Sequence, residues 1–216
     1  NEEQIAALQA HFPGIEYGIF PNVQTIPEHV PPKAKPFLVV WVANLKDMKR
    51  PEKFIDLAES FQSRSDIRFI MIGRDQYSNI REVRTRIEIL PNIEFLGELP
   101  QAEVNDWLGQ ASLLVNTSTY EGFSNTFVQA WMRKTPVVSL KVNPSGILDK
   151  GKVGACADDD MQRLHDLVED FLDHLEKLES YGRQAFEYAR KNHCVEQVFP
   201  RMLDCIQQLT SDKNGL

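Results

Sequence analysis

Residues 121–130, EGFSNTFVQA, place an acid, a glycine and small polar side chains between an apolar segment and a helical one. Glu121 precedes the expected helix, so it cannot complete a capping box and is free to face a crevice. The backbone amides of Ser124, Asn125 and Thr126 begin that helix, where the first amides lack helical partners and attract anions. The combination predicts an anion site; the alternative is a solvated carboxylate with Ser124 as the helix cap.

A basic loop supplies the opposite charge. The stretch NLKDMKR, residues 44–50, contains Lys46, Lys49 and Arg50. A lysine ammonium can follow a phosphate through a changing geometry, whereas helix amides are fixed donors. If the two segments meet, together they suit a diphosphate. The alternative is that Lys49 is a solvated surface lysine.

The remaining residues of the stretch have simpler explanations beside functional ones. Gly122 supplies backbone freedom next to a ligand. Asn125 and Gln129 are four residues apart and share a helix face, so Gln129 could bond a ribose through its donor and acceptor together. Gln129 is equally well explained as a partly exposed helix residue. Phe123 and Phe127 are expected in the core rather than stacked on a ligand.

Apolar segments that alternate with amphipathic ones must position these residues. Strands are predicted at 37–43, 67–73, 92–97, 112–116, 136–140 and 152–157. Helices are predicted between them, from Pro51 onward and at 79–88, 101–110 and 124–134, with a short helical turn near 146–149. Nearly continuous apolar strands with helical crossovers indicate a parallel sheet covered on both faces. The fold class is therefore α/β, doubly wound, with six strands.

Topology predicts where a ligand binds. If the strands adopt the common order 3-2-1-4-5-6, the sheet reverses direction between its first and fourth strands, and ligands bind at that point. The loops that leave the carboxyl ends of these two strands are residues 44–50 and 117–124. The basic loop and Glu121 are therefore expected at one crevice.

The start of the chain departs from the alternation. Residues 2–11 have helical spacing, and 15–20 resembles a short strand. Residues 21–36 contain five prolines, which disfavour helix and central strand, so they read as an extended connection. We therefore expect a boundary at residue 36, with 37–216 as the main domain.

After residue 160 the chain is predicted to be helical to its end. Apolar residues from Leu164 to Leu178 recur at spacings of three and four, and further helices are expected at 181–192 and 195–209. Pro200 should kink or begin the last of these. The acidic run 158–160 is read as a solvated helix start, where carboxylates meet the positive end of the helix dipole.

Composition and missing motifs exclude several function classes. The net charge of −7 disfavours a nucleic-acid partner, which usually requires a basic face. The turn after the first strand has no glycine, and the chain has no G-x-x-x-x-G-K-S/T loop, so nicotinamide dinucleotides and nucleotide hydrolysis are disfavoured. No apolar run approaches the roughly 18 residues of a membrane span. A soluble protein without a transmembrane segment is expected.

Cysteines and histidines give no sign of a metal site. The three cysteines are far apart and form no C-x-x-C pair, and the five histidines are scattered. We expect neither disulfides nor a bound metal, and a reducing, cytoplasmic compartment.

In combination, the motifs resemble the carboxyl-terminal, nucleotide-sugar-binding domain of GT-B glycosyltransferases of the retaining family 4, the glycosyl transferases group 1. Members typically carry E-G-F-x-x-x-x-x-E-A, a helix and then G-x-P-V-V; here EGFSNTFVQAWMRKTPVV runs from Glu121 to Val138. They also carry a lysine five residues after an arginine, and V-x-F-L-G before an amphipathic helix. This chain has Lys49 at the expected offset and IEFLG at 93–97. The resemblance spans most of the chain and implies one half of a GT-B fold.

The resemblance also implies roles for individual residues. Lys49 would neutralise the donor diphosphate, and Glu121 would lie beside the transferred sugar and its phosphate. The amides from Phe123 to Thr126 would hold sugar hydroxyls and phosphate, and Gln129 would approach the ribose. The remaining expected donor contacts are Asn44, Gly73, Arg74 and Gly122, with Leu96 and Leu99 bordering the base pocket.

A two-domain enzyme follows from the same resemblance. Its donor substrate would be a nucleoside-diphosphate sugar, used without a cofactor or obligatory metal. The acceptor, a glycan, lipid or small molecule, would bind an amino-terminal domain of which residues 1–36 resemble only the end and the crossover. The whole enzyme would be cytoplasmic, with peripheral association at the inner face of a membrane allowed. We expect this chain to bind a nucleotide sugar without transferring the sugar by itself, because the crevice closes only between two domains.

Two departures from the family pattern leave a second hypothesis open. Asn44 replaces a phosphate-binding arginine and adds no charge toward a leaving group. Gln129 replaces a glutamate and loses the anionic acceptor for ribose hydroxyls. The chain is therefore either the donor domain of an active retaining glycosyltransferase or a nucleotide-sugar-binding module with lost or weakened catalysis. A response-regulator-like domain is disfavoured because it needs an acidic cluster where this chain has lysines.

Overall fold

A six-stranded parallel sheet organises the computed structural model, which describes residues 2–13 and 20–211. The strands are β1 Phe37–Val42, β2 Ile67–Ile72, β3 Ile93–Phe95, β4 Leu113–Asn116, β5 Val137–Ser139 and β6 Gly154–Cys156. Their order is β3-β2-β1-β4-β5-β6, and every neighbouring pair is parallel. The predicted strand number and order are confirmed.

Alternate residues of β1 explain why both faces of the sheet are covered. Val39 and Trp41 belong to one buried cluster, and Leu38 and Val40 belong to the other. Successive strand residues point to opposite faces, so a strand that is apolar at every position must be buried on both. The continuous apolar run FLVVWV is therefore the cause of the two-sided core.

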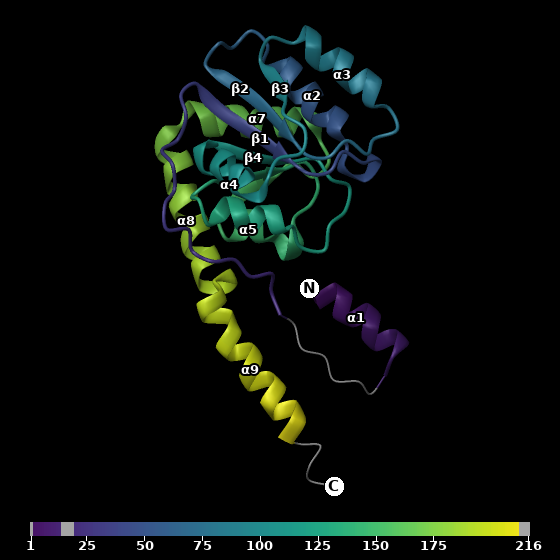
Figure 1. The fold of residues 1–216 in the computed structure, drawn as a ribbon, viewed down its shortest axis with the longest axis vertical. Coiled ribbons are helices and arrows are strands. Elements are labelled where there is room, and N and C mark those ends of the chain that lie inside the picture. The colour runs from purple at the N-terminus through teal and green to yellow at the C-terminus, as the bar shows by residue number, and fades with distance from the viewer. Residues whose placement is uncertain (1, 14–19, 212–216) are drawn as a thin grey trace.

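The helices divide between these two faces. The helices α2 Pro51–Ser60, α3 Ile80–Ile89 and α7 Met161–Asp173 supply buried residues to the cluster that contains Val39. The other cluster is covered by α4 Gln101–Gln110, α5 Asn125–Trp131 and α6 Ile147–Lys150. Short 3-10 turns occupy Asp47–Lys49 and Pro144–Gly146. Figure 1 shows α4 and α5 on the other side of the sheet from α2 and α3.

The helical region after residue 160 is broken where the sequence predicted a continuous stripe. The helix α7 ends at Asp173, His174 has the non-helical angles φ −121° and ψ 80°, and α8 Leu175–His193 follows. Leu175 is 53% exposed, so it does not belong to the apolar stripe, whereas Leu178 is buried. The break lets the chain pass from α7, which packs on α2, to α8, which packs on α5.

Two other predicted helix boundaries also differ. Helix α5 ends at Trp131 instead of residue 134, because Lys134 takes a left-handed backbone and the amide of Thr135 turns back to the carbonyl of Ala130. The last helix, α9 Val195–Ser211, contains Pro200 in its interior, so the proline does not begin it. Asp160 does cap α7, with its carboxylate accepting from two backbone amides, which confirms the predicted helix start.

The described segments at the two ends of the chain add no strand to the sheet. The helix α1 Glu2–His11 is present as predicted, but the expected strand at 15–20 falls almost wholly on residues that the structure does not describe. Residues 20–36 form neither helix nor named strand, as their prolines predicted, and the amide of Gln24 bonds the carbonyl of His193. Helix α9 extends away from the sheet (Figure 1). Among the described helices, none combines the length and apolar character needed to cross a membrane.

Candidate functional site

The loops that follow β1 and β4 are bonded to each other. The amide of Thr119 donates to the carbonyl of Met48 at 2.9 Å. The Thr117 hydroxyl contacts the carbonyls of Lys49 at 2.6 Å and Arg50 at 3.0 Å, while Trp41 Nε1 donates to the same oxygen at 2.9 Å. Thr117 is fully buried, so these bonds are shielded from water. The topology therefore brings the basic loop, residues 44–50, and the loop that contains Glu121, residues 117–124, together as predicted.

The result is an ion pair between Lys49 and Glu121. Lys49 Nζ lies 2.9 Å from Glu121 Oε1, and the two side chains are 20% and 12% exposed. The same oxygen accepts from Asn116 Nδ2 at 2.8 Å and from Ser118 Oγ at 2.7 Å. Glu121 is therefore neither a solvated loop carboxylate nor unpartnered, and Lys49 is not a free surface lysine. Sequence reasoning missed Asn116 and Ser118, although a polar run directly after a buried strand was a usable signal.

The surroundings of Glu121 favour its ionised form. Burial by itself would raise the pKa of the carboxyl group, but the bonds from Ser118, Lys49 and Asn116 outweigh it and hold the pKa of Glu121 below its usual value. A carboxylate that accepts several donors and faces an ammonium stays charged at neutral pH. The pair is thus a fixed dipole at the switch point of the sheet.

Arg50 ties a third loop to this arrangement. Its backbone is left-handed, with φ 47° and ψ 57°, at the start of α2. Its guanidinium donates to the carbonyl of Thr117 at 2.7 Å and to Asp159 Oδ1 at 2.6 Å. Arg50 and Lys141 together lower the pKa of Asp159. The loops after β1, β4 and β6 are therefore joined through one side chain.

An open cleft of about 310 Å³ lies at the carboxyl ends of the first strands. The described residues that line it are Val42, Ala43, Asn44, Ile72, Gly73, Arg74, Glu98, Leu99, Gln101, Val104, Asn125, Thr126 and Gln129. The structure thus gathers seven of the predicted donor contacts, from Asn44 to Gln129, around one hollow. The lining of this hollow does not include the other predicted residues, Lys49, Leu96, Glu121, Gly122, Phe123 and Ser124. Glu98 and Gln101 were missed, although Leu99 between them was expected at the base pocket.

Gly73 forms the floor of the cleft for a steric reason. Its φ is 155°, and a Cβ at this position would lie 1.7 Å from the carbonyl oxygen of Ala43. Its amide also donates to the carbonyl of Gly97 at 2.8 Å. Only glycine allows the ends of β1 and β2 to approach this closely.

The start of α5 is not capped by a side chain. Ser124 occupies the cap position in an extended conformation, is 5% exposed and makes no side-chain bond to the helix. Ser124 is therefore the N-cap residue, as the alternative had it, but its side chain does not bond the helix amides. Asn125, Thr126 and Gln129 line the cleft, so Gln129 lies near the crevice mouth as its spacing predicted.

The aromatic residues of the stretch belong to the packing of the domain. Phe127 is fully buried, and Phe123 contacts the rings of Trp131 and His193 at centroid distances of 6.1 and 5.0 Å. Asn22 Nδ2 donates to the carbonyl of Phe123 at 3.0 Å, and His193 Nδ1 donates to the carbonyl of Asn22 at 2.8 Å. Burial lowers the pKa of His193, so this histidine is a neutral packing residue. Residues 20–36 are thus bonded, through Asn22, to the loop that contains Glu121, Gly122 and Phe123.

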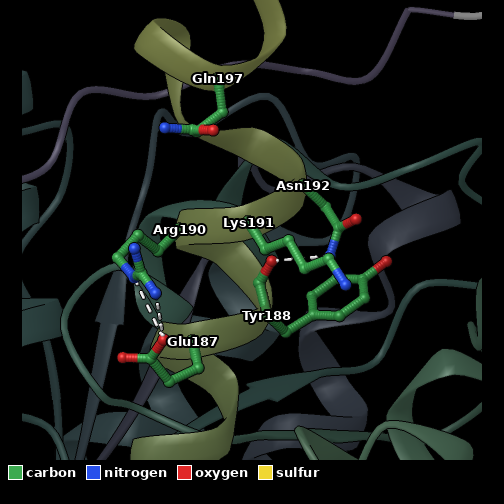
Figure 2. Close-up of a pocket in the computed structure, with 6 residues that line it drawn as sticks. All are labelled: Glu187, Tyr188, Arg190, Lys191, Asn192 and Gln197. Atoms are coloured by element: carbon green, nitrogen blue, oxygen red, sulfur yellow. Dashed lines mark hydrogen bonds and ion pairs between the residues drawn. The ribbon is translucent and has the colours of Figure 1, made fainter.

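Neither a candidate metal centre nor a disulfide occurs among the described residues. No group of three or more potential metal ligands occurs in residues 2–13 and 20–211, and all three cysteines are free thiols. A larger hollow of about 520 Å³ lies on α8 and the start of α9 (Figure 2). Its polar groups come from neighbouring turns and pair locally, as Arg190 does with Glu187 at 2.7 Å. None of the predicted site residues lines it.

We predict that the backbone of Arg50 is strained. Replacing Arg50 by glycine or alanine removes the same guanidinium bonds, but only glycine relaxes the left-handed conformation, which costs other residues roughly 1–2 kcal/mol. Arg50→Gly should therefore be more stable than Arg50→Ala by about 1 kcal/mol in urea unfolding. The matched control is Lys46, which has an extended backbone in the same loop. There the alanine variant should equal or exceed the glycine variant, and the same order at both positions would refute the strain.

We also predict a pH-dependent contribution from Glu121. Because its folded pKa is depressed, its stabilisation is present above the unfolded pKa, near 4.5, and is lost as the pH falls through the folded pKa. Wild type should exceed Glu121→Gln in unfolding free energy by about 1–3 kcal/mol at pH 7. The difference should shrink steadily below about pH 4.5. A difference that stays constant from pH 7 to pH 3 would contradict the ion-paired state.

Comparisons with solved structures find the same architecture in longer proteins. A TarM variant from S. aureus, crystallised with UDP among its ligands, superposes with a TM-score of 0.77 at 21% identity, over 94% of this chain and 42% of that one. Anabaena HepE in complex with UDP gives 0.70 at 20% identity, over 80% and 49%. Sucrose-phosphate synthase from Thermosynechococcus elongatus gives 0.79 at 16% identity, over 97% and 57%. The chain thus spans only about half the length of these proteins, and the likeness shows the fold.

The family comparison is more specific. No curated protein matches the chain. The sequence model of the family described as "Glycosyl transferases group 1" matches residues 22–188, which take in the whole sheet, the Lys49–Glu121 pair and the cleft. Because this match covers well over half of the sequence, the chain belongs to the glycosyl transferases group 1 family, and its sheet and helices form one half of a GT-B fold.

Proposed function

We propose that residues 37–216 are the donor-binding domain of a retaining glycosyltransferase, which transfers a sugar from a nucleoside-diphosphate sugar to an acceptor held by another domain. The observation that carries the proposal is the cleft at the reversal point of the sheet, with the half-buried Lys49–Glu121 pair on the loops that flank the reversal. Family membership supports the transferase activity. The structures of TarM and HepE with UDP, and of HepE with UDP-glucose, support a nucleotide-sugar donor.

In this proposal the chemistry is mainly electrostatic. When the bond between sugar and diphosphate breaks, negative charge develops on the diphosphate, and preorganised donors lower the barrier. Lys49 and the first amides of α5 would supply these donors without an obligatory metal or cofactor. Glu121, held by Ser118 and Asn116, would position the sugar rather than carry a proton, since it is ionised and accepts three donors.

The acceptor lies outside this domain in our proposal. Residues 1–36 would be the end of an amino-terminal acceptor domain and the crossover from it, and the acceptor would be a glycan, a lipid or a small molecule. The bonds from Asn22 to Phe123 and from His193 to Asn22 support a mechanical link between the crossover and the EGF loop. We place the whole enzyme in the cytoplasm, with peripheral contact at a membrane as one option and no nucleic-acid partner.

A second candidate is a nucleotide-sugar-binding module with weakened catalysis. The observation in its favour is the polarity of the cleft: Asn44 and Gln129 both line it, and neither carries a charge. In addition, Lys49 is already neutralised by Glu121, so its charge is available to a donor only at the cost of that pair.

Donor binding is tested by titration calorimetry of this chain with UDP, GDP, ADP and their sugars. We expect one nucleotide to bind, and its sugar conjugate to bind as well. Circular dichroism of the same sample shows that the protein is folded. A folded protein that binds none of these ligands would eliminate both candidates.

Catalysis is tested in a protein that also carries the acceptor half. Glu121→Ala should abolish sugar transfer if the domain is catalytic and change nothing if it is a binding module. We expect this chain alone to show no turnover with any donor, because half of the crevice is missing. Measurable transfer by the isolated chain would refute that expectation.

A further inference from the structure

The charged residues of the cleft are few. Among the described residues that line it, only Arg74 and Glu98 carry a full charge, and all other lining residues are apolar or neutral. A diphosphate in this cleft therefore meets one cation directly. Lys49 is not among the lining residues.

Arg74 and Glu98 face each other from two different loops. Arg74 Nε donates to Glu98 Oε2 at 2.9 Å, and Nη2 donates to Oε1 at 2.5 Å, a two-point contact between guanidinium and carboxylate. Arg74 follows β2 and Glu98 follows β3, so the pair connects adjacent parts of the cleft rim. Both side chains are more than half exposed, at 55% and 56%.

The backbone of Arg74 is bonded to the loop after β1, whereas its side chain lies in an exposed ion pair. The carbonyl of Arg74 accepts from the amide of Leu45 at 2.9 Å, and its amide approaches Asn44 Oδ1 at 3.4 Å. These contacts fix the root of the side chain beside the uncharged Asn44. The guanidinium pairs with Glu98, and an exposed pair of this kind contributes little net free energy.

The two ion pairs of the site therefore differ in how easily they open. Separating Lys49 from Glu121 would leave a half-buried carboxylate without its cation, which costs more than it would in water. Separating Arg74 from Glu98 exposes both groups to water and costs little. A guanidinium also binds phosphate oxygens with the same forked geometry that it uses for a carboxylate.

We propose that Arg74 is a further cation, in addition to Lys49, that binds the diphosphate of the donor, and that Glu98 is an internal competitor that holds Arg74 across the rim while the cleft is empty. The inference rests on the proposed donor-binding function. A nucleoside diphosphate displaces the Glu98 carboxylate from Arg74, so the two members of the ion pair have opposite effects on binding.

The test is calorimetric titration of four single variants with UDP and with uridine, or with the matching pair of whichever nucleotide wild type binds. Arg74→Gln should weaken UDP binding tenfold or more, and Glu98→Gln should tighten it several-fold, because Arg74 is then released. The uncharged nucleoside should bind all variants alike. Arg68 and Glu94 are the matched control: they form an exposed pair between the same two strands, at 3.0 Å, outside the cleft. Arg68→Gln and Glu94→Gln should leave UDP affinity unchanged.

The signs of the effects decide the outcome. If Glu98→Gln weakens UDP binding, Glu98 contacts the ligand itself and the competition is refuted. If Arg74→Gln changes the affinities for UDP and uridine equally, Arg74 does not contact the phosphates. If neither Arg74→Gln nor Glu98→Gln alters the affinity for UDP, the proposal is also overturned. Wild type that binds no nucleotide removes the donor-binding function as well, which distinguishes that failure from the others. Thermal unfolding of each variant identifies any loss of fold.

Discussion

The fully buried hydroxyl of Thr117 holds the site together. It accepts from the indole of Trp41, in the central strand, and contacts the carbonyls of Lys49 and Arg50, in the loop after that strand. Leaving a buried polar group without a hydrogen-bond partner costs about 1–3 kcal/mol. These bonds therefore fix the geometry of the loop. The position of Lys49, the left-handed turn at Arg50 and the pairing with Glu121 all depend on this junction between β1 and β4.

The site has two ion pairs of contrasting character. The Lys49–Glu121 pair is largely buried and reinforced by Ser118 and Asn116, whereas the Arg74–Glu98 pair is exposed. Buried pairs resist separation because each charge would lose its partner in a medium that solvates it poorly. Exposed pairs exchange partners readily because water stabilises the separated charges. In our proposal the first pair keeps Lys49 and Glu121 in position for the donor, and in the second pair the phosphate replaces Glu98 as the partner of Arg74.

This division bears on the choice between an enzyme and a binding module. Asn44 and Gln129 line the cleft without adding a charge that could attract an anionic donor. In our proposal Arg74 offsets that lack of charge from the loop after β2, which lies against the end of β1 because Gly73 has no side chain. Family membership and the fold establish the class of the domain, and in our proposal the acceptor binds another domain.

The sequence by itself determined the layers, the strand order and the location of the site in the fold. Strand and helix periodicity is local, and the order of a doubly wound sheet follows from few rules, so FLVVWV, the EGF stretch and Lys49 could be placed before any coordinates. The tertiary structure alone decided the partners of Glu121, the break at His174 and the approach of Glu98 to Arg74. These depend on contacts between residues distant in sequence or on which face a helix packs against. Local patterns contain neither, and this is why no partner of Glu121 was predicted and Glu98 was not expected at all.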